Sequence, residues 1–252
     1  MKLKDRFTDR VFTLGGSILL LCIVMAIVFP NKFPTIDNFS QLMLNLSIDT
    51  IVAVGMMVLM IAGMFDLSVG SVVAFAGGMA GYLMYYHHVN FVPAIMAGVA
   101  GSVLIGFING WLIARVGINP MIQTLAMMGI VRGFALMLSG AGIQNFPYEY
   151  TVIGQSKLFG LQMPVWYMLL VVIVFAYLTK NTSFFRRYYF IGGSEKAARL
   201  SGINVEKMKV WAFVISATLA GVAGILLSSR LGAALSTSGR GLEMRVITAV
   251  IL

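Results

Sequence analysis

The chain has little charge and almost no cysteine. Of its 252 residues only 11% are charged and 59% are hydrophobic, whereas a soluble domain is about 45–50% apolar and about 25% charged. A mean hydropathy of +0.91 agrees that there is too little polar surface to face water. Cys22 is the single cysteine and lies in an apolar run, so an internal disulfide is excluded and no thiol chemistry is implied. This composition is typical of an integral membrane protein.

Several motifs of catalysis are also missing. The sequence contains no G-x-x-x-x-G-K-[ST] motif, so we expect no P-loop ATP site in this chain. No carboxylate or histidine cluster has metal-ligand spacing, and no nucleophile–base constellation is visible, so we predict neither an enzyme nor a metal or cofactor site. A net charge of +9 can indicate nucleic-acid binding. We reject that interpretation because the basic residues lie between apolar stretches, as topology signals do.

Apolar stretches long enough to cross a bilayer recur along the chain, since a span needs about 20 apolar residues. We predict seven spans, at residues 11–29, 42–64, 69–86, 91–114, 121–138, 163–179 and 210–228. The first could be a signal peptide, but it is long and is followed by FPNKFPT rather than a small-residue cleavage site, which favours a retained anchor. The last apolar run, residues 244–252, stops unfinished, so we expect the chain to lack later spans.

The basic residues set the predicted orientation, because Lys and Arg gather on the cytoplasmic side. With the N-terminus in the cytoplasm, the inside residues are Lys2, Lys4, Arg6, Arg10, Arg115, Lys180, Arg186, Arg187, Lys196, Arg199, Lys207 and Lys209. The outside residues are only Lys32, Lys157, Arg230, Arg240 and Arg245. The bias supports both the orientation and the number of spans.

The charged segment 180–209 predicts a short helix between two spans. Gly192 and Gly193 break the chain, Ser194 is an N-cap, and Gly202 is a C′ stop. The helix between them carries Glu195, Lys196, Ala197, Ala198, Arg199 and Leu200. Two interpretations stay open: its small apolar face, formed by Ala197, Leu200 and Ser201, docks into a groove on a partner, or the segment is a solvated amphipathic linker.

Four stretches carry a family resemblance. FIGGSEKAARLSGINVEK resembles the cytoplasmic coupling segment of permeases in the ribose/galactose/xylose group of bacterial ABC importers. The Asp-Leu-Ser-Val-Gly signature of that group is similar to IAGMFDLSVGSVVAF. Its Pro-x-[FI]-[IV]-x-T-L segment is similar to INPMIQTLAMMGIVRGFAL, and the start of its late Gly-rich signature is similar to GLEMRVITAVIL. The four follow the family order over residues 61–252. Two departures are Met64-Phe65, where members commonly have Gly-Ile, and Arg245, where members often have Asp.

The resemblance implies an all-α polytopic bundle of about ten spans, of which about seven are present here. It implies one transmembrane permease domain over residues 1–252, with a coupling loop at residues 180–209, in the bacterial inner membrane. The expected partners are an ABC ATPase that holds ATP and Mg²⁺, a second permease subunit (identical or not), a periplasmic sugar-binding protein and membrane lipid. The permease would translocate a small sugar, whose identity the sequence leaves open. The alternatives are a branched-chain amino-acid permease of the same superfamily and an ion-coupled secondary transporter; the latter needs buried carboxylates, for which only Asp49 qualifies.

Polar residues within or between spans are the candidates for the translocation pathway. Asp66, Leu67, Ser68 and Gly70 form the signature at the break between two spans. Broken helices often line transporter pathways, whereas the topology favours a plain cytoplasmic turn here. Further candidates are Asn109, Asn119, Pro120, Gln123 and Thr124. For Asn109, Gln123 and Thr124 the alternative is hydrogen bonding between helices.

Two intramembrane charges lead to one specific hypothesis. Asp49 and Arg132 lie at similar expected depths in the outer half of the second and fifth spans. A lone charge there costs at least about 2.5–3.5 kcal/mol, which a partner of opposite sign relieves. We therefore predict an Asp49–Arg132 ion pair; the alternative is that Asp49 caps a helix and Arg132 extends toward the headgroups.

Overall fold

The computed structural model describes the backbone of residues 3–252 and the side chains of residues 12–252. The chain forms two compact units, residues 1–43 and residues 44–252. Both are helical, and the strands present are two residues long. The predicted all-α membrane fold is confirmed, whereas the orientation and the extent of one permease domain stay predictions.

The first unit contains α1 (Leu3–Val28) and the first turns of α2 (Ile36–Ile61). The backbone N–H of Asn38 donates to the Thr35 hydroxyl at 3.3 Å, so Thr35 caps the start of α2. The predicted first span lies in α1, in which Phe12–Val28 is apolar. Its large apolar side chains are mostly exposed, as lipid contact requires. Membrane crossing by this segment stays a prediction.

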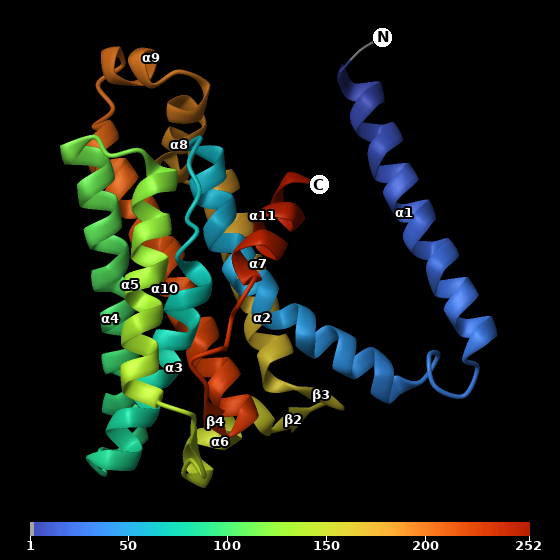
Figure 1. Cartoon of the computed structure of the whole chain (residues 1–252). Helices are drawn as coiled ribbons and strands as arrows, with labels where there is room; N and C mark the ends of the chain where they lie inside the picture. The colour runs from blue at the N-terminus through green and yellow to red at the C-terminus, as the bar shows by residue number, and fades with distance from the viewer. Residues whose placement is uncertain (1–2) are drawn as a thin grey trace. The chain divides into compact units, whose positions relative to one another are not determined.

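The second unit contains the rest of α2 and the remaining elements (Figure 1). Its helices are α3 (Val69–Tyr86), α4 (Phe91–Trp111) with a π-helical turn (Leu112–Val116), α5 (Pro120–Ser139), α6 (Tyr148–Gln155), α7 (Met163–Asn181), α8 (Ser183–Gly193), α9 (Glu195–Leu200), α10 (Val205–Leu231) and α11 (Leu242–Ile251). Its strands form two antiparallel pairs, β1 (Ile143–Gln144) with β4 (Ala233–Ala234) and β2 (Lys157–Leu158) with β3 (Leu161–Gln162).

Among the residues that the structure describes, six helices are long and apolar enough to cross a membrane: α2, α3, α4 with its π-helical turn, α5, α7 and α10. They correspond to six of the seven predicted spans, and their ends differ by a few residues, most at α2, which begins at Ile36. Two helices were not predicted from sequence, α6 and α8. Each is at most eleven residues long, too short to give a span-length apolar signal. The apolar run predicted at residues 244–252 lies in α11.

α10 is the centre of the second unit and packs against α3, α4 and α6. Glycines bring the backbones close: a Cβ at Gly224 would collide with the Val73 carbonyl of α3, and one at Gly106 of α4 would lie 2.6 Å from the Phe213 carbonyl. Small residues serve this purpose in membrane bundles, where helices gain stability from close packing rather than from hydrophobic burial. The backbone of α10 is therefore in close contact with those of α3 and α4.

The opposite end of α10 from α9 is closed by α6. The Tyr150 side chain of α6 is fully buried, and its hydroxyl bonds with the Ser228 hydroxyl at 2.5 Å and donates to the Ile225 carbonyl at 3.2 Å. The Ser229 hydroxyl donates back to the Tyr150 carbonyl at 2.6 Å. These bonds satisfy polar groups that burial would otherwise destabilise, and they fix this end of the bundle.

The connection between α2 and α3 runs inside the bundle. α2 ends at Ile61, close to Gly192 of α8, and an extended segment then leads back before α3 begins at Val69 (Figure 1). Met64, Asp66, Leu67 and Ser68 in this segment are at most 5% exposed. The segment is therefore not the plain exposed turn that the topology favoured, and its side of the membrane stays a prediction. Irregular backbone within a membrane bundle requires partners from protein or water.

Candidate functional site

Two places in the second unit bring the predicted functional residues together: the short helix α9 and the buried break before α3. α9 spans Glu195–Leu200, as expected. The Ser194 hydroxyl accepts a hydrogen bond from the Ala197 N–H at 3.3 Å, which confirms the predicted N-cap. The N–H of Gly202 bonds to Arg199 O and that of Ile203 to Ala198 O, which is a Schellman C-cap. Gly202 supplies the left-handed backbone, at φ +80°.

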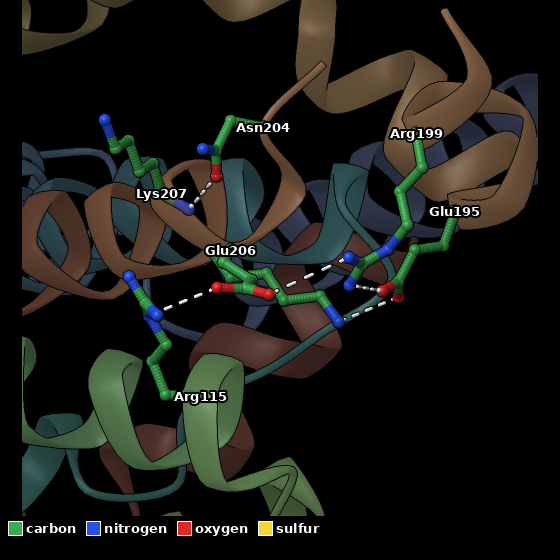
Figure 2. Close-up of polar contacts among 7 residues, drawn as sticks. Arg115, Glu195, Arg199, Asn204, Glu206 and Lys207 are labelled. Carbon is green, nitrogen blue, oxygen red and sulfur yellow. Dashed lines mark hydrogen bonds and ion pairs between the residues drawn. The ribbon is translucent and has the colours of Figure 1, made fainter. Parts of the chain in front are cut away.

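A chain of ion pairs holds α9 against α10 and α4 (Figure 2). Glu195 accepts hydrogen bonds from Arg199 at 2.9 Å and from Lys209 of α10 at 2.8 Å. Arg199 also lies 3.8 Å from Glu206, which pairs with Arg115 after α4 at 3.1 Å. Exposed ion pairs contribute little one by one, but a connected network fixes geometry. The network therefore mechanically joins the short helix to two membrane-spanning helices.

Figure 2 also shows the start of α10, where the Asn204 side chain accepts a hydrogen bond from the Lys207 N–H at 3.0 Å. Asn204 therefore caps the helix that follows α9. Glu206 then lies in the first turn of α10, where the helix dipole favours a negative charge. Its carboxylate is thus well placed to face Arg115 and Arg199.

The charge network predicts a measurable pH response. Hydrogen bonds from Lys209 and then Arg199 hold the pKa of Glu195 below its ordinary value of 4.5. A lowered native pKa stabilises the fold above the ordinary pKa and loses that effect as the pH falls through the lowered value. At pH 7, Glu195→Gln should speed hydrogen exchange of the α9 backbone amides by roughly two- to tenfold. This factor corresponds to the free energy contributed by one or two exposed ion pairs.

The matched control for that experiment is Lys196→Gln, since Lys196 is exposed on the same helix. It should exchange as the wild type does. The difference between wild type and Glu195→Gln should shrink once the pH falls well below 4.5. Equal exchange of the α9 amides in wild type and Glu195→Gln at pH 7 would contradict the network.

The exposed surface of α9 corrects part of the docking prediction. Ala198 is 2% exposed and packs into the core, so it does not belong to a docking face. Lys196, Ala197 and Ser201 are exposed, and Leu200 is 90% exposed. The face named from sequence, formed by Ala197, Leu200 and Ser201, is thus the exposed one, and docking through it stays a prediction. Gly192 and Gly193 are both exposed at the end of α8, and a Cβ at Gly192 would collide with the Ile61 carbonyl.

The buried break is held by polar contacts across three helices. The Asp66 carboxylate accepts from the Ser68 N–H at 2.7 Å and from the Ser68 hydroxyl at 2.6 Å. Asn109 of α4 donates to the Ser68 hydroxyl at 3.2 Å, and Gln123 of α5 donates to Asn109 at 3.2 Å. Asp66, Ser68 and Asn109 are fully buried and Gln123 is 8% exposed. Four predicted residues thus form one hydrogen-bond network. For Asn109 and Gln123 this agrees with the alternative interpretation, hydrogen bonding between helices.

The other members of the predicted set have local roles. The Asn119 side chain caps α5 by accepting from the Met121 N–H at 2.9 Å, and Pro120 occupies the first turn. The Thr124 hydroxyl donates back to the Pro120 carbonyl at 2.8 Å. Leu67 is buried in the break. These residues shape the elements that carry the network, and the structure shows no contact to a pathway for them.

Two signature segments meet at Gly70. A Cβ at this position would collide with the Gly239 carbonyl and would lie 2.6 Å from a carboxylate oxygen of Glu243. Gly239 lies in the loop before α11, at φ +68°, and a Cβ there would lie 2.5 Å from the Gly70 carbonyl. Two helices therefore begin beside each other within the bundle, α3 at Val69 and α11 at Leu242. Interrupted helices of this kind form the binding regions of many transporters.

Arg132 holds the loop before α11. Its guanidinium donates to the Ser236 carbonyl at 2.6 Å and to the Ser238 carbonyl at 2.7 Å. Asp49 instead forms a two-point contact with Arg245 of α11, at 2.9 and 3.2 Å. The predicted Asp49–Arg132 pair is therefore wrong. Equal depth was a poor criterion because the loop before α11 turns back into the bundle and presents its own carbonyls to Arg132.

Removing the Arg132 guanidinium should destabilise the bundle. Arg132→Met leaves two carbonyls without a charged donor, and hydrogen bonds to charged groups contribute about 1.5–3 kcal/mol each. We expect a loss of about 2–4 kcal/mol, measured as a lower thermal midpoint of the purified protein in detergent. Arg132→Lys should recover part of it, because one guanidinium nitrogen donates both bonds and an ammonium also carries several N–H donors on one nitrogen, but on a shorter side chain. The control Arg186→Met, on the exposed side of α8, should be neutral; an equally neutral Arg132→Met would contradict the assignment.

Several residues of the α9 ion-pair network and of the break before α3 were not predicted from sequence. Arg115, Glu206 and Lys209 join the α9 network, and Gly239 and Glu243 face the break. The i,i+4 spacing of Glu195 and Arg199 was the one local signal for the network; the other contacts join elements far apart in sequence. Among the described residues, no group of three or more His, Cys, Asp or Glu side chains could hold a metal ion.

A bundle of spans with an interrupted helix inside and a rigid short helix beyond one end defines a polytopic transport permease. Comparison with known proteins agrees. Residues 38–252 match the family described as branched-chain amino acid transport system / permease component, and the chain belongs to this family. The predicted family resemblance is confirmed.

Curated relatives cover most of the chain. The L-arabinose transport system permease protein AraH of Escherichia coli (strain K12) is 37% identical over 238 residues, 92% of this chain and 71% of that protein. The ribose import permease protein RbsC of Haemophilus influenzae is 33% identical over 242 residues, 94% of this chain and 74% of that protein. The D-allose transport system permease protein AlsC of Escherichia coli (strain K12) is 31% identical over 241 residues. No solved structure matches the chain significantly.

Proposed function

We propose that the chain is the permease subunit of an ATP-driven ABC importer for a monosaccharide, in the bacterial inner membrane. The observation that carries the proposal is α9: a capped, ion-paired helix that presents Leu200 at 90% exposure, in a chain whose relatives are named as sugar permeases. A large apolar side chain at the tip of a polar helix is suited to a partner's groove. The partner would be an ABC ATPase, which holds ATP and Mg²⁺.

The contacts of the second unit suggest how ATP hydrolysis would be coupled to translocation. A periplasmic binding protein delivers the sugar to a pair of permease subunits, and closure of the ATPases moves α9. Through Glu195–Lys209 and Arg115–Glu206 the movement reaches α10 and the end of α4. α10 packs on α3 through Gly224, so the movement reaches the Asp66–Gly70 break. The switch between outward and inward access would take place at this break, where α3 and the loop before α11 touch.

The two alternatives fit the findings less well. The family description mentions branched-chain amino acids, but relatives that match more than nine-tenths of the chain are named for arabinose, ribose and allose. An ion-coupled secondary transporter needs a carboxylate free to bind and release a cation. Asp49, the carboxylate considered for that role, is engaged at two points by Arg245. The fully buried carboxylate described above, Asp66, accepts two hydrogen bonds from Ser68.

Co-purification tests the proposal. The chain is expressed with an ATPase subunit and a sugar-binding protein from the same genome and is purified by a tag on the permease. We expect the ATPase to co-purify, and its ATP hydrolysis to rise when the binding protein and its monosaccharide are added. A permease that purifies folded and alone under these conditions would overturn the proposal. The variant Leu200→Asp should retain less ATPase than the wild type.

A further inference from the structure

A cavity of about 320 Å³ lies between α2, α10 and α11, and polar and apolar side chains both line it. Asn45 and Asp49 of α2, Arg230 of α10 and Arg245 of α11 line its polar side. Leu227 and Leu242 contribute an apolar side. Its volume lies at the lower end of the about 300–1,000 Å³ typical of small-molecule sites.

The polar side chains are pre-arranged in pairs. Arg245 contacts both carboxylate oxygens of Asp49, at 2.9 and 3.2 Å, and Arg230 donates to the Asn45 side-chain carbonyl at 3.1 Å. A guanidinium has five N–H donors and a carboxylate about four lone-pair sites, so each group keeps unused hydrogen-bonding capacity. Asn45 and Asp49 are four residues apart and share one face of α2, toward this cavity.

This polar surface lies far from the end of its helix. Asp49 is twelve residues before Ile61, the last residue of α2, or about 18 Å along the helix axis. Asp49 and Arg245 are partly exposed, with 31% and 56% of their side chains accessible. Charged groups at such depth do not face acyl chains, and in membrane proteins they line water-filled cavities or ligand pathways.

We propose that this cavity is a binding subsite for a monosaccharide on the translocation route, an inference that rests on the proposed function. Adjacent hydroxyls of a sugar are both donors and acceptors, so they match a carboxylate, an amide and two guanidinium groups. Leu227 and Leu242 face the C–H side of the ring. Arg245, which replaces the Asp often found in the resembled family, provides a fixed donor by pairing with Asp49.

The subsite is connected to the helix break. Gly239 belongs to the cavity wall and touches Gly70, while Arg132 fixes the loop that carries Gly239. A change at the break therefore alters the wall of the cavity. Conversely, a sugar bound in the cavity favours one position of this loop. Binding of the sugar is thereby linked to the switch between outward and inward access.

Cysteine protection tests the subsite in the assembled importer. Cys22→Ser removes the single native cysteine, and Leu227→Cys places a thiol in the cavity wall while all four polar side chains remain. In proteoliposomes containing permease, ATPase and binding protein, a membrane-impermeant methanethiosulfonate should modify this thiol. The monosaccharide that the importer takes up, chosen from L-arabinose, D-ribose and D-allose, should slow the modification at least threefold. His87→Cys, in the loop after α3, is the control that should show no protection.

Asn45→Ala provides a second measurement, because it removes one amide without changing charge. Uptake should fall about tenfold, the equivalent of one lost hydrogen bond of about 1.4 kcal/mol, while the ATPase still co-purifies. If the importer takes up sugar but Leu227→Cys is unreactive or unprotected, the subsite is wrong and the proposed function stands. If none of the sugars is taken up with ATP, the proposed function fails, and this inference fails with it.

Discussion

Leu200→Asp is expected to lower ATP-driven sugar uptake at least tenfold while the permease stays folded in the membrane. Leu200 makes almost no contact within the chain, at 90% exposure, so its replacement leaves the core intact. A buried apolar anchor at an interface contributes about 2–4 kcal/mol when truncated, and a charge in an apolar groove is worse. Uptake in proteoliposomes and the amount of ATPase retained by the tagged permease measure the two effects.

Two matched variants separate docking from folding. Lys196→Glu changes charge at an exposed position of the same helix and should keep most of the uptake. Ala198→Glu places a charge at a position that is 2% exposed and should reduce the yield of folded protein instead. Unchanged uptake by Leu200→Asp would rule out docking through α9, however the other two variants behave.

Gly70→Ala is expected to destabilise the bundle by about 3 kcal/mol or more. The added Cβ would collide with the Gly239 carbonyl, a backbone atom in a loop that Arg132 fixes at two points. Overpacking a close contact typically costs about 1–3 kcal/mol, and more when the obstacle is backbone rather than a side chain that can rotate. A lower thermal midpoint in detergent, together with a lower yield of monodisperse protein, should show it.

Gly129→Ala is the control for that experiment. Gly129 lies in α5, and a Cβ there would have no atom within 4 Å. Because alanine favours a helix over glycine by about 0.5–1 kcal/mol, this variant should be as stable as the wild type or slightly more so. If Gly70→Ala is equally stable, then the two signature segments do not touch as described.

Local signals determined how much of the fold could be predicted from sequence. The span 69–86 matches α3 at both ends because the apolar run is bounded by Asp66-Leu67-Ser68 and by His87-His88. The caps at Ser194, Gly202 and Asn204 were likewise predictable, since a cap depends on a few adjacent residues. Whether Ala197 or Ala198 is buried depends on how α9 sits on the bundle, which adjacent residues do not determine.

The break before α3 shows what local sequence misses. Phe65-Asp66-Leu67-Ser68 looks like any short turn between two spans, and only Asn109 and Gln123, from helices farther along, make it a buried segment. The partner of Asp49 was missed for the same reason. The run 244–252 lies in α11, which begins beside α3, and only this placement in the fold brings Arg245 to Asp49.

The most direct test of the central claim is the energy source of uptake. The permease is reconstituted with its ATPase and binding protein, and uptake of labelled L-arabinose, D-ribose and D-allose is followed with ATP inside the vesicles or with an imposed proton or sodium gradient. We predict that one of these sugars accumulates only when ATP, ATPase and binding protein are all present. Accumulation driven by an ion gradient in the absence of ATP would contradict the account.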